Sequence, residues 1–351
     1  MTGKKILLLA GEESGMIYAR ELMARLPGCE FRTYQDYGFE IADLAVFGFA
    51  AVLRRIFFFL RVKRTMERAI DDWKPDAIVT IDYPGMNLKL DAYAKKRGVK
   101  AVHVVCPQVW AWHQGRIPKI EASLDRLCCF FPFEPKLFRP GFAVFTGHPL
   151  AKQLSGVVRT PIAGQVALLP GSRKGEVSRI LPPLLEVARR YPDRRFVLPA
   201  AHERAARWIS RYALPANVEV RQGGAREILL QSECAVVASG TATLEAAFCH
   251  CPTILVYRVS ALLAAILRRM ITGTKYAGLA NIIWDRCGGE GEQPMIELLQ
   301  EDFTVEAVCQ QLDKWLNDAD AREKQSALLE KTVSLLRSEG DPMENIVEQI
   351  A

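Results

Sequence analysis

The sequence predicts an α/β protein with two Rossmann-like, doubly wound domains that face a cleft. Three observations support this prediction. Short apolar runs alternate with longer helical stretches, the alternation occurs in two series, and a stretch containing glycine and proline, near 147–164, separates the series. The 351 residues, half of them apolar, suffice for two domains that each bury a core. We expect a first domain over 1–157 and a second over 158–327.

Each series consists of short apolar runs that are bounded by turn residues, which is typical of buried parallel strands. The first series covers residues 5–10, 77–82, 101–106 and 126–131, and the second covers 165–169, 195–199, 218–220, 234–238 and 253–257. Ligands of doubly wound sheets bind beyond the carboxyl ends of the strands. The residues that follow each run are therefore the candidates for function.

Composition excludes several classes of protein. No segment approaches the roughly 18 apolar residues of a membrane span, and the run at 6–10 is too short for a signal-peptide core. The nine cysteines form no C-x-x-C pair, which is typical of reduced cytoplasmic thiols. Cys249, His250 and Cys251 are adjacent and cannot all face one ion, so we expect no metal site there.

Two glycine-containing turns in the second domain predict a nucleotide site. Gly171, Ser172 and Arg173 follow one apolar run, and Ser239, Gly240 and Thr241 follow another. Small residues at a helix amino terminus let a diphosphate approach the free N–H groups, and an arginine can neutralise a departing nucleoside diphosphate. Glu245, one turn into the second helix, can accept hydrogen bonds from ribose hydroxyls. The alternative is that both turns only cap helices.

The first domain places an acidic residue at a strand end. Asp82 is the best candidate for a general base, and Glu12, in the glycine-bracketed turn 11–15, is its rival. Either carboxylate could instead belong to a turn or a helix start. The strict G-x-G-x-x-G fingerprint is missing from the turn at 11–15, which argues against a nicotinamide enzyme.

A further strand end carries Gln108, Trp110 and Trp112 towards Arg116 and Lys119. Aromatic rings near cations suit sugars and phosphates, although buried tryptophans serve cores equally well.

The segment 47–68 interleaves aromatic and basic residues. Such an amphipathic helix can lie in a lipid interface and attract anionic head groups. The side chains expected at the membrane are Phe57, Phe58, Phe59, Arg61, Lys63 and Arg64. A core helix with a solvated basic face is the alternative. The apolar-basic run 261–275 favours the membrane, and phenylalanines among the cations make nucleic acid a poorer partner.

Eight motifs resemble, in order, the signature blocks of lipid-A-disaccharide synthases, and the match covers nearly the whole chain. The motifs are AGEESG at 10–15, IDYP at 81–84, PQVWAW at 107–112, TGHP at 146–149, LLPGSR at 168–173, SGTATLE at 239–245, YR at 257–258 and ELLQ at 297–300.

The resemblance implies a GT-B fold whose C-terminal helix, within 328–351, crosses back onto the first domain. It implies inverting transfer of 2,3-diacylglucosamine from UDP to the 6-hydroxyl of 2,3-diacylglucosamine 1-phosphate, giving a β-1,6 disaccharide and UDP without a metal or other cofactor. It also implies a cytoplasmic protein held peripherally at the anionic inner face of the cytoplasmic membrane. A homodimer is compatible with this expectation.

The resemblance assigns residues to roles as well. Asp82 occupies the position of the family's essential aspartate. The donor side would comprise Gly171, Ser172, Arg173, Ser239, Gly240, Thr241, Glu245, Tyr257, Arg258 and Asn281. The acceptor side would comprise Ser14, Gly15, Asn87, Gln108, Trp110 and His148.

Three acceptor-side carboxylates that are usual in the family are replaced by Met16, Ala51 and Gly85. Because Asp82 and the donor motifs are present, we expect an active synthase. Two alternatives stay open: a divergent paralogue that binds a UDP-sugar but uses another acceptor, and a non-catalytic protein that binds UDP and lipid. A UDP-sugar epimerase on the same fold is disfavoured, because a soluble sugar does not require the basic aromatic helix.

Overall fold

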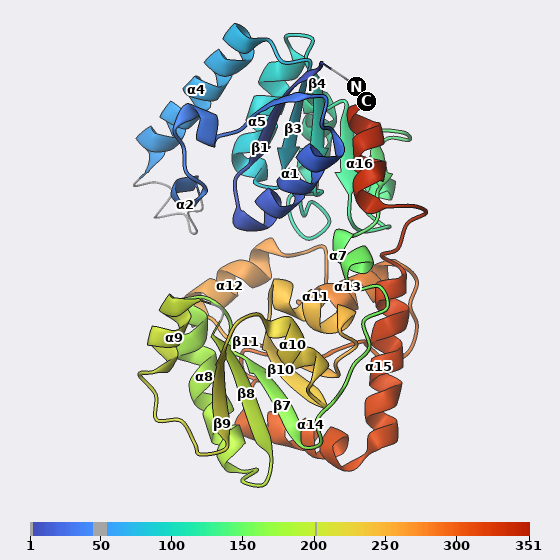
Figure 1. Cartoon of the computed structure of the whole chain (residues 1–351). Coiled ribbons are helices and arrows are strands. Elements are labelled where there is room, and N and C mark those ends of the chain that lie inside the picture. Colours follow the sequence, from blue (N-terminus) through green and yellow to red (C-terminus); the bar gives the residue numbers. More distant parts are fainter. Residues whose placement is uncertain (1–2, 45–54, 201) are drawn as a thin grey trace. The chain divides into compact units, whose positions relative to one another are not determined.

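A computed structural model describes residues 3–44, 55–200 and 202–351. The chain forms two compact units, and each is described by itself (Figure 1). The first unit comprises Met1–Pro149 and Ser338–Ala351, and the second comprises Leu150–Arg337.

The first unit is built on a six-stranded parallel sheet with the order β2-β1-β3-β4-β5-β6 among the described residues. Its strands are β1 (Lys5–Ala10), β2 (Glu30–Arg32), β3 (Ala77–Ile81), β4 (Lys100–Val104), β5 (Arg126–Cys129) and β6 (Ala143–Phe145). Its main helices are α1 (Glu13–Arg25), α2 (Ile41–Leu44), α4 (Ile56–Trp73), α5 (Pro84–Lys95), α6 (Ile117–Ser123) and α16 (Pro342–Ile350). The central strands are buried along their length, as expected for a sheet covered on both faces.

The second unit repeats the design with the strand order β12-β11-β10-β7-β8-β9, again in parallel pairs. Its strands are β7 (Gln165–Leu169), β8 (Arg195–Ala200), β9 (Val218–Gln222), β10 (Cys234–Ala238), β11 (Thr253–Tyr257) and β12 (Ile296–Leu299). Its helices are α8 (Lys174–Arg189), α9 (Glu203–Ile209), α10 (Ala225–Leu230), α11 (Thr241–Phe248), α12 (Ala261–Met270), α13 (Leu279–Arg286), α14 (Val305–Asn317) and α15 (Ala319–Ser334), while α7 (Pro149–Gln153) spans the boundary between the units.

All nine predicted strands are present, and three further strands were not predicted. Those three are β2, β6 and β12, which have three or four residues and lie at edges of the sheets. Short edge strands bury few apolar side chains, so they lack the run that identifies a central strand. The predicted strand 77–82 ends one residue early, because Asp82 takes a left-handed conformation that leaves the sheet.

The C-terminal helix α16 completes the core of the first unit, beside α1 (Figure 1). Met343, Ile346 and Ile350 are buried in that core, and Arg25 of α1 forms an ion pair with Asp341 at 3.0 Å. The chain returns to the first unit at Ser338, ten residues later than predicted from the sequence. The reason is that α15 stays in the second unit to its end.

None of the nine cysteines is joined in a disulfide among the described residues, and seven of them are buried. In the described part of the chain, no helix combines the length and the apolar character needed to cross a membrane.

Candidate functional site

Asp82, the candidate general base, lies where three neighbouring strands of the first unit end. Ala10 of β1 pairs with Ile81 of β3, which pairs with Val104 of β4. The residues that follow these positions therefore emerge side by side at the carboxyl edge of the sheet. Asp82 is tied to this edge because its N–H donates to the carbonyl of Val104 at 2.9 Å. Its carboxylate is half-buried.

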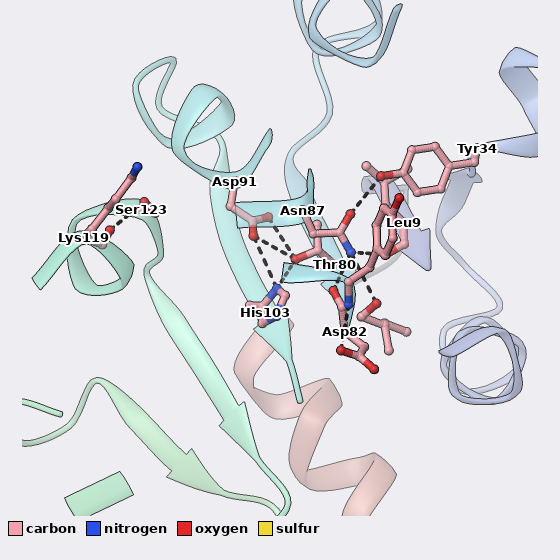
Figure 2. A network of polar contacts seen from close by, with 11 residues as sticks. Leu9, Tyr34, Thr80, Asp82, Asn87, Asp91, His103, Lys119 and Ser123 are labelled. Carbon is pink, nitrogen blue, oxygen red and sulfur yellow. Dashed lines mark hydrogen bonds and ion pairs between the residues drawn. The ribbon is translucent and has the colours of Figure 1, made fainter. Parts of the chain in front are cut away.

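The turn that carries Asp82 has an unusual backbone. Asp82 and Tyr83 have φ values of 50° and 53°, a left-handed conformation that is costly for residues with a Cβ. Two successive residues persist there only if neighbours hold them. Asn87 does so, since its Nδ2 donates to the carbonyls of Leu9, Ile81 and Asp82 at 3.3, 3.3 and 2.8 Å (Figure 2).

Asn87 is itself fixed by a buried partner. The hydroxyl of Tyr34 donates to Asn87 Oδ1 at 2.8 Å, and both side chains are fully buried (Figure 2). The amide of Asn87 is thus used within the protein on both its nitrogen and its oxygen. Asn87, which the family resemblance assigns to the acceptor side, also holds the turn that carries Asp82.

Tyr83 links the two candidate carboxylates. Its ring packs against Gly11 so closely that a Cβ at Gly11 would lie 2.5 Å from the ring, which explains the glycine. Burial, followed by the charge of Glu12, raises the pKa of Tyr83 to about 12. Burial, followed by the charge of Asp82, raises the pKa of Tyr18 to about 12. The charge of Glu12 therefore acts on Tyr83, and the charge of Asp82 acts on Tyr18.

Behind this edge lies a buried polar network that the sequence analysis did not identify. Thr80 Oγ1 lies 2.9 Å from Asp91 Oδ2 and 2.6 Å from His103 Nδ1 (Figure 2). All three side chains are fully buried, and burial raises the pKa of Asp91. The network crosses from α5 to β3 and β4, so it fixes the helix that carries Asn87 against the sheet.

The other predicted acceptor-side residues divide into exposed and buried ones. Ser14 and Gln108 are exposed, and Gly15 is buried against Ala10. Trp110 is 2% exposed, and its Nε1 donates to Glu134 Oε1 at 3.0 Å, so its ring belongs to the core. His148 is also buried, and burial lowers its pKa to about 3, which leaves its ring neutral at pH 7.

Two of the three replaced carboxylates have a structural context. Met16 is buried in the core of the first unit, so its side chain does not extend to the surface of the site. Gly85 is exposed in the first turn of α5. Ala51 lies outside the described residues.

The second unit brings its predicted donor residues to one sheet edge as well. Leu169 of β7 pairs with Val237 of β10, and Ala238 pairs with Val256 of β11. Gly171 lies in the turn after β7, and Gly240 lies in the turn after β10. Tyr257 is the last residue of β11. The N–H of Ser239 donates to the carbonyl of Val256 at 3.0 Å, which holds the middle turn to the neighbouring strand.

The turn after β7 is filled by a carboxylate from its own helix. Glu176 Oε2 accepts from the N–H groups of Ser172 and Arg173 at 3.1 and 3.2 Å, and Oε1 accepts from Arg173 Nη1 at 3.0 Å. Gly171 has a φ of 100°, and a Cβ there would lie 2.4 Å from the same carboxylate. The signal that could have revealed Glu176 is an acidic residue three positions after a helix cap.

The turn after β10 has no such carboxylate. Gly240, with a φ of 149°, precedes α11, and no side chain caps this helix among the described residues. No atom lies within 4 Å of the position that a Cβ at Gly240 would take. This space leaves room for an anion at the free N–H groups that begin α11. Glu245 lies in α11 with 27% of its side chain exposed, and it pairs with Arg226 at 3.4 Å.

Three more predicted donor residues have different surroundings. Tyr257 is half-buried, and burial together with the charge of Glu176 raises its pKa, which places its ring near the turn after β7. Arg258 donates to the carbonyl of Gln300 at 3.2 Å and packs on Phe303, so it holds the end of β12. Asn281 is 1% exposed and uses its amide within the unit.

Asn281 belongs to a clamp that includes Glu297, a residue of the ELLQ motif to which the sequence assigns no role of its own. Its Nδ2 donates to Glu297 Oε1 at 2.8 Å, and its Oδ1 accepts from the N–H of Met295 at 2.8 Å. Glu297 also accepts from the N–H groups of Ala277 and Gly278 at 2.9 Å, directly before α13. This clamp joins β12 to α13.

The basic aromatic helix α4 exposes only part of its predicted membrane face. Phe57 is 83% exposed, with Ile56 and Leu60 exposed beside it. Phe58 and Phe59 are half-buried and pack against the core instead. Among the cations, Arg61 and Arg64 are exposed, whereas Lys63 forms an ion pair with Glu67.

Within the described residues, one buried cluster contains side chains that could ligate a metal. Cys106, Cys129 and Glu134 offer ligand atoms within 4.8 Å of one another. Glu134 already accepts hydrogen bonds from Trp110 and from the N–H of Phe131, and burial raises its pKa to about 8. Burial also raises the pKa of the Cys129 thiol. The carboxylate of Glu134 is thus used within the protein, and the cluster is part of the buried core.

Comparisons with known proteins agree on the family. The family model described as lipid-A-disaccharide synthetase matches residues 6–351. The lipid-A-disaccharide synthase of Anaeromyxobacter dehalogenans (strain 2CP-C) is 35% identical, with 99% of this chain and 96% of that protein covered. That of Syntrophus aciditrophicus (strain SB) is 34% identical, with 92% and 91% covered.

Solved structures give the fold. MurG of Acinetobacter baumannii matches with a TM-score of 0.59 and 13% identity, covering 98% of each chain. At this identity the likeness concerns the fold alone. The two parallel sheets, together with the similarity to solved glycosyltransferase structures, confirm the predicted GT-B fold.

Proposed function

This chain belongs to the lipid-A-disaccharide synthase family and is a glycosyltransferase. We propose that it transfers 2,3-diacylglucosamine from UDP to the 6-hydroxyl of 2,3-diacylglucosamine 1-phosphate. The products are the β-1,6-linked disaccharide and UDP. The observation that best supports this reaction is the family match over nearly the whole chain, with Asp82 held at a strand end by Asn87.

Asp82 is the proposed general base. Its carboxylate takes the proton of the acceptor 6-hydroxyl as that oxygen forms a bond to C1 of the donor sugar, and the bond from C1 to the diphosphate oxygen breaks. Attack from the face opposite UDP inverts the configuration at C1. The left-handed turn at Asp82 and Tyr83 supports this role, because strained backbone that neighbours hold in place pre-organises a reacting group.

The donor diphosphate is proposed to bind at the amino terminus of α11. Gly240 and Thr241 offer backbone N–H groups there, and the helix dipole favours an anion. Arg173 would leave Glu176 to contact the diphosphate, since its side chain is 59% exposed. Glu245 would exchange Arg226 for the ribose hydroxyls. Charge on the departing UDP is thereby neutralised by this chain's own groups.

The protein is proposed to work at the cytoplasmic face of an anionic membrane, where acylated sugars reside. The support comes from α4, which exposes Phe57 beside Arg61 and Arg64. An exposed apolar tip flanked by cations suits the interface between acyl chains and anionic head groups.

Turnover of the purified protein in detergent tests the reaction. We expect UDP release and a lipid disaccharide from the two acylated substrates. Asp82→Asn should lower kcat by about 10²-fold or more and spare UDP affinity, because a lost general base affects proton transfer and not nucleotide binding. Asp72→Asn is the matched control, since it removes an exposed carboxylate of α4.

Unchanged kcat in Asp82→Asn would refute the base assignment. Retained UDP binding by a wild-type protein that forms no disaccharide would refute the proposed acceptor.

A further inference from the structure

Helix α12 of the second unit is a short helix that makes little contact with its own unit. Of its ten residues only Ala264 is buried, and Leu267 is half-buried. A helix normally buries an apolar stripe against the domain that carries it. In α12 the buried stripe consists of Ala264 alone, and the larger apolar side chains apart from Leu267 are exposed.

The exposed side of α12 carries a continuous apolar stripe. Leu262 is 74% exposed, Ile266 44% and Met270 37%, and residues spaced by four lie on one helix face. Leu263 and Ile271 widen the stripe and are 42% and 38% exposed. Soluble proteins rarely leave such a group of large apolar residues in water unless it meets a partner.

Cations accompany the stripe, and acids are missing from it. Residues 259–284 contain Arg268, Arg269 and Lys275 but no aspartate or glutamate. Arg268 pairs with Glu301, and Lys275 pairs with Asp285, at 3.0 and 3.2 Å. Arg269 is exposed and follows Ile266 by three residues, next to the stripe. Apolar residues beside an exposed cation such as Arg269 complement an anionic lipid surface.

The shape of this face distinguishes among partners. The two cavities that we find in the second unit, of about 550 and 460 Å³, are lined by other residues. A groove would be needed to enclose a single acyl chain or a peptide. A convex helix with apolar and basic side chains suits a bilayer surface, into which each side chain can insert separately.

We propose that α12 is a membrane-docking helix, which inserts Leu262, Ile266 and Met270 into an anionic bilayer while Arg269 contacts its head groups. The inference deepens the proposed function and rests on it in one respect, namely that the substrates lie in a bilayer. It adds a membrane contact on the second unit to the one proposed for α4 on the first.

Vesicle flotation of the full chain tests the proposal. Vesicles contain phosphatidylglycerol in phosphatidylethanolamine, or phosphatidylcholine alone. We expect Leu262→Ser with Ile266→Ser to lower partitioning onto the anionic vesicles by about tenfold or more. The matched control is Val157→Ser with Val158→Ser, which removes two exposed apolar residues of the same unit and should leave partitioning unchanged.

Charge reversal tests the electrostatic part. Arg269→Glu should lower partitioning onto anionic vesicles by about tenfold, and should leave the weak binding to phosphatidylcholine unchanged. Arg204→Glu, an exposed arginine of α9, is its control. Thermal unfolding of all variants should match the wild type, because the altered side chains are exposed.

Several outcomes would overturn the proposal. One is wild-type partitioning of the α12 double variant. Another is a raised KM for the donor in detergent with unchanged vesicle binding, which would assign α12 to the donor's acyl chains. A lowered melting temperature with unchanged partitioning would mean that this face is covered by protein. Turnover is measured separately, so vesicle binding without disaccharide synthesis contradicts the proposed function alone.

Discussion

At the scale of single residues, Asn87 determines how Asp82 is presented. Three carbonyls share its amide, and one of them belongs to Asp82 itself. An alanine would leave these buried acceptors without a donor, so we expect Asn87→Ala to cost about 2–3 kcal/mol of stability. It should also lower kcat about tenfold, since the turn is released. Urea unfolding and steady-state kinetics measure the two effects.

Asn217 provides the control for this experiment. Its Nδ2 also donates to three carbonyls, those of Ala188, Tyr191 and Arg194, but it lies in the second unit. Asn217→Ala should destabilise the protein without lowering kcat. Equal kcat values for the two variants would reduce Asn87 to a structural residue.

Glu134 makes stability depend on pH. Burial raises its pKa from 4.5 to about 8 in the folded protein, whereas the unfolded chain keeps the lower value. Between these values the folded state holds a proton that the unfolded state has lost, so the free energy of unfolding falls as pH rises from about 4.5 to about 8. The full difference is on the order of 5 kcal/mol.

Denaturant unfolding at a series of pH values measures this effect as the difference between the wild type and Glu134→Gln, which cannot titrate. Parallel pH profiles for the two proteins would show that Glu134 is ionised in the folded state.

At the scale of elements, the two glycine turns of the second unit differ in how their N–H groups are used. Glu176 occupies the turn before α8, and the amino terminus of α11 has no equivalent. We expect Gly240→Ala to weaken UDP binding by about tenfold, because a Cβ would enter the space at the free N–H groups. Its φ of 149° would add about 1–3 kcal/mol of strain. Calorimetric titration with UDP measures the affinity.

Gly223→Ala separates strain from lost binding. Gly223 has a φ of 123° and open space around its Cβ position, and it follows β9 at the edge of the same sheet. We expect a similar loss of stability and unchanged UDP affinity. A weakened affinity in both variants would mean that strain alone explains the effect.

At the scale of the whole molecule, the first unit depends on the end of the chain. Ile346 of α16 is fully buried in its core. We expect Ile346→Ala to destabilise the first unit by about 2–5 kcal/mol. UDP binding, which we assign to the second unit, should persist at temperatures that unfold the first. Thermal unfolding followed in parallel with UDP titration measures both. Glu348→Ala, an exposed change in the same helix, should stay within about 0.5 kcal/mol of the wild type.

The sequence by itself determined the architecture and the location of the candidate site. Buried parallel strands carry apolar runs such as 165–169 that need no knowledge of their partners, and a parallel sheet collects the residues after its strands at one edge. Asp82 and Gly240 could therefore be assigned to sheet edges in advance, and the order of the motifs identified the family.

Only the tertiary structure decided what each of those residues contacts. Asn87, Trp110 and Asn281 have polar groups that fit a ligand or a buried partner equally well, and the choice depends on neighbours distant in the sequence. Glu134 lies 24 residues from Trp110, and Tyr34 lies 53 residues from Asn87. The same limit applies to α12, whose apolar residues resemble those of a core helix. Their exposure among the described residues is known only from the fold, which buries little of α12 against its own unit.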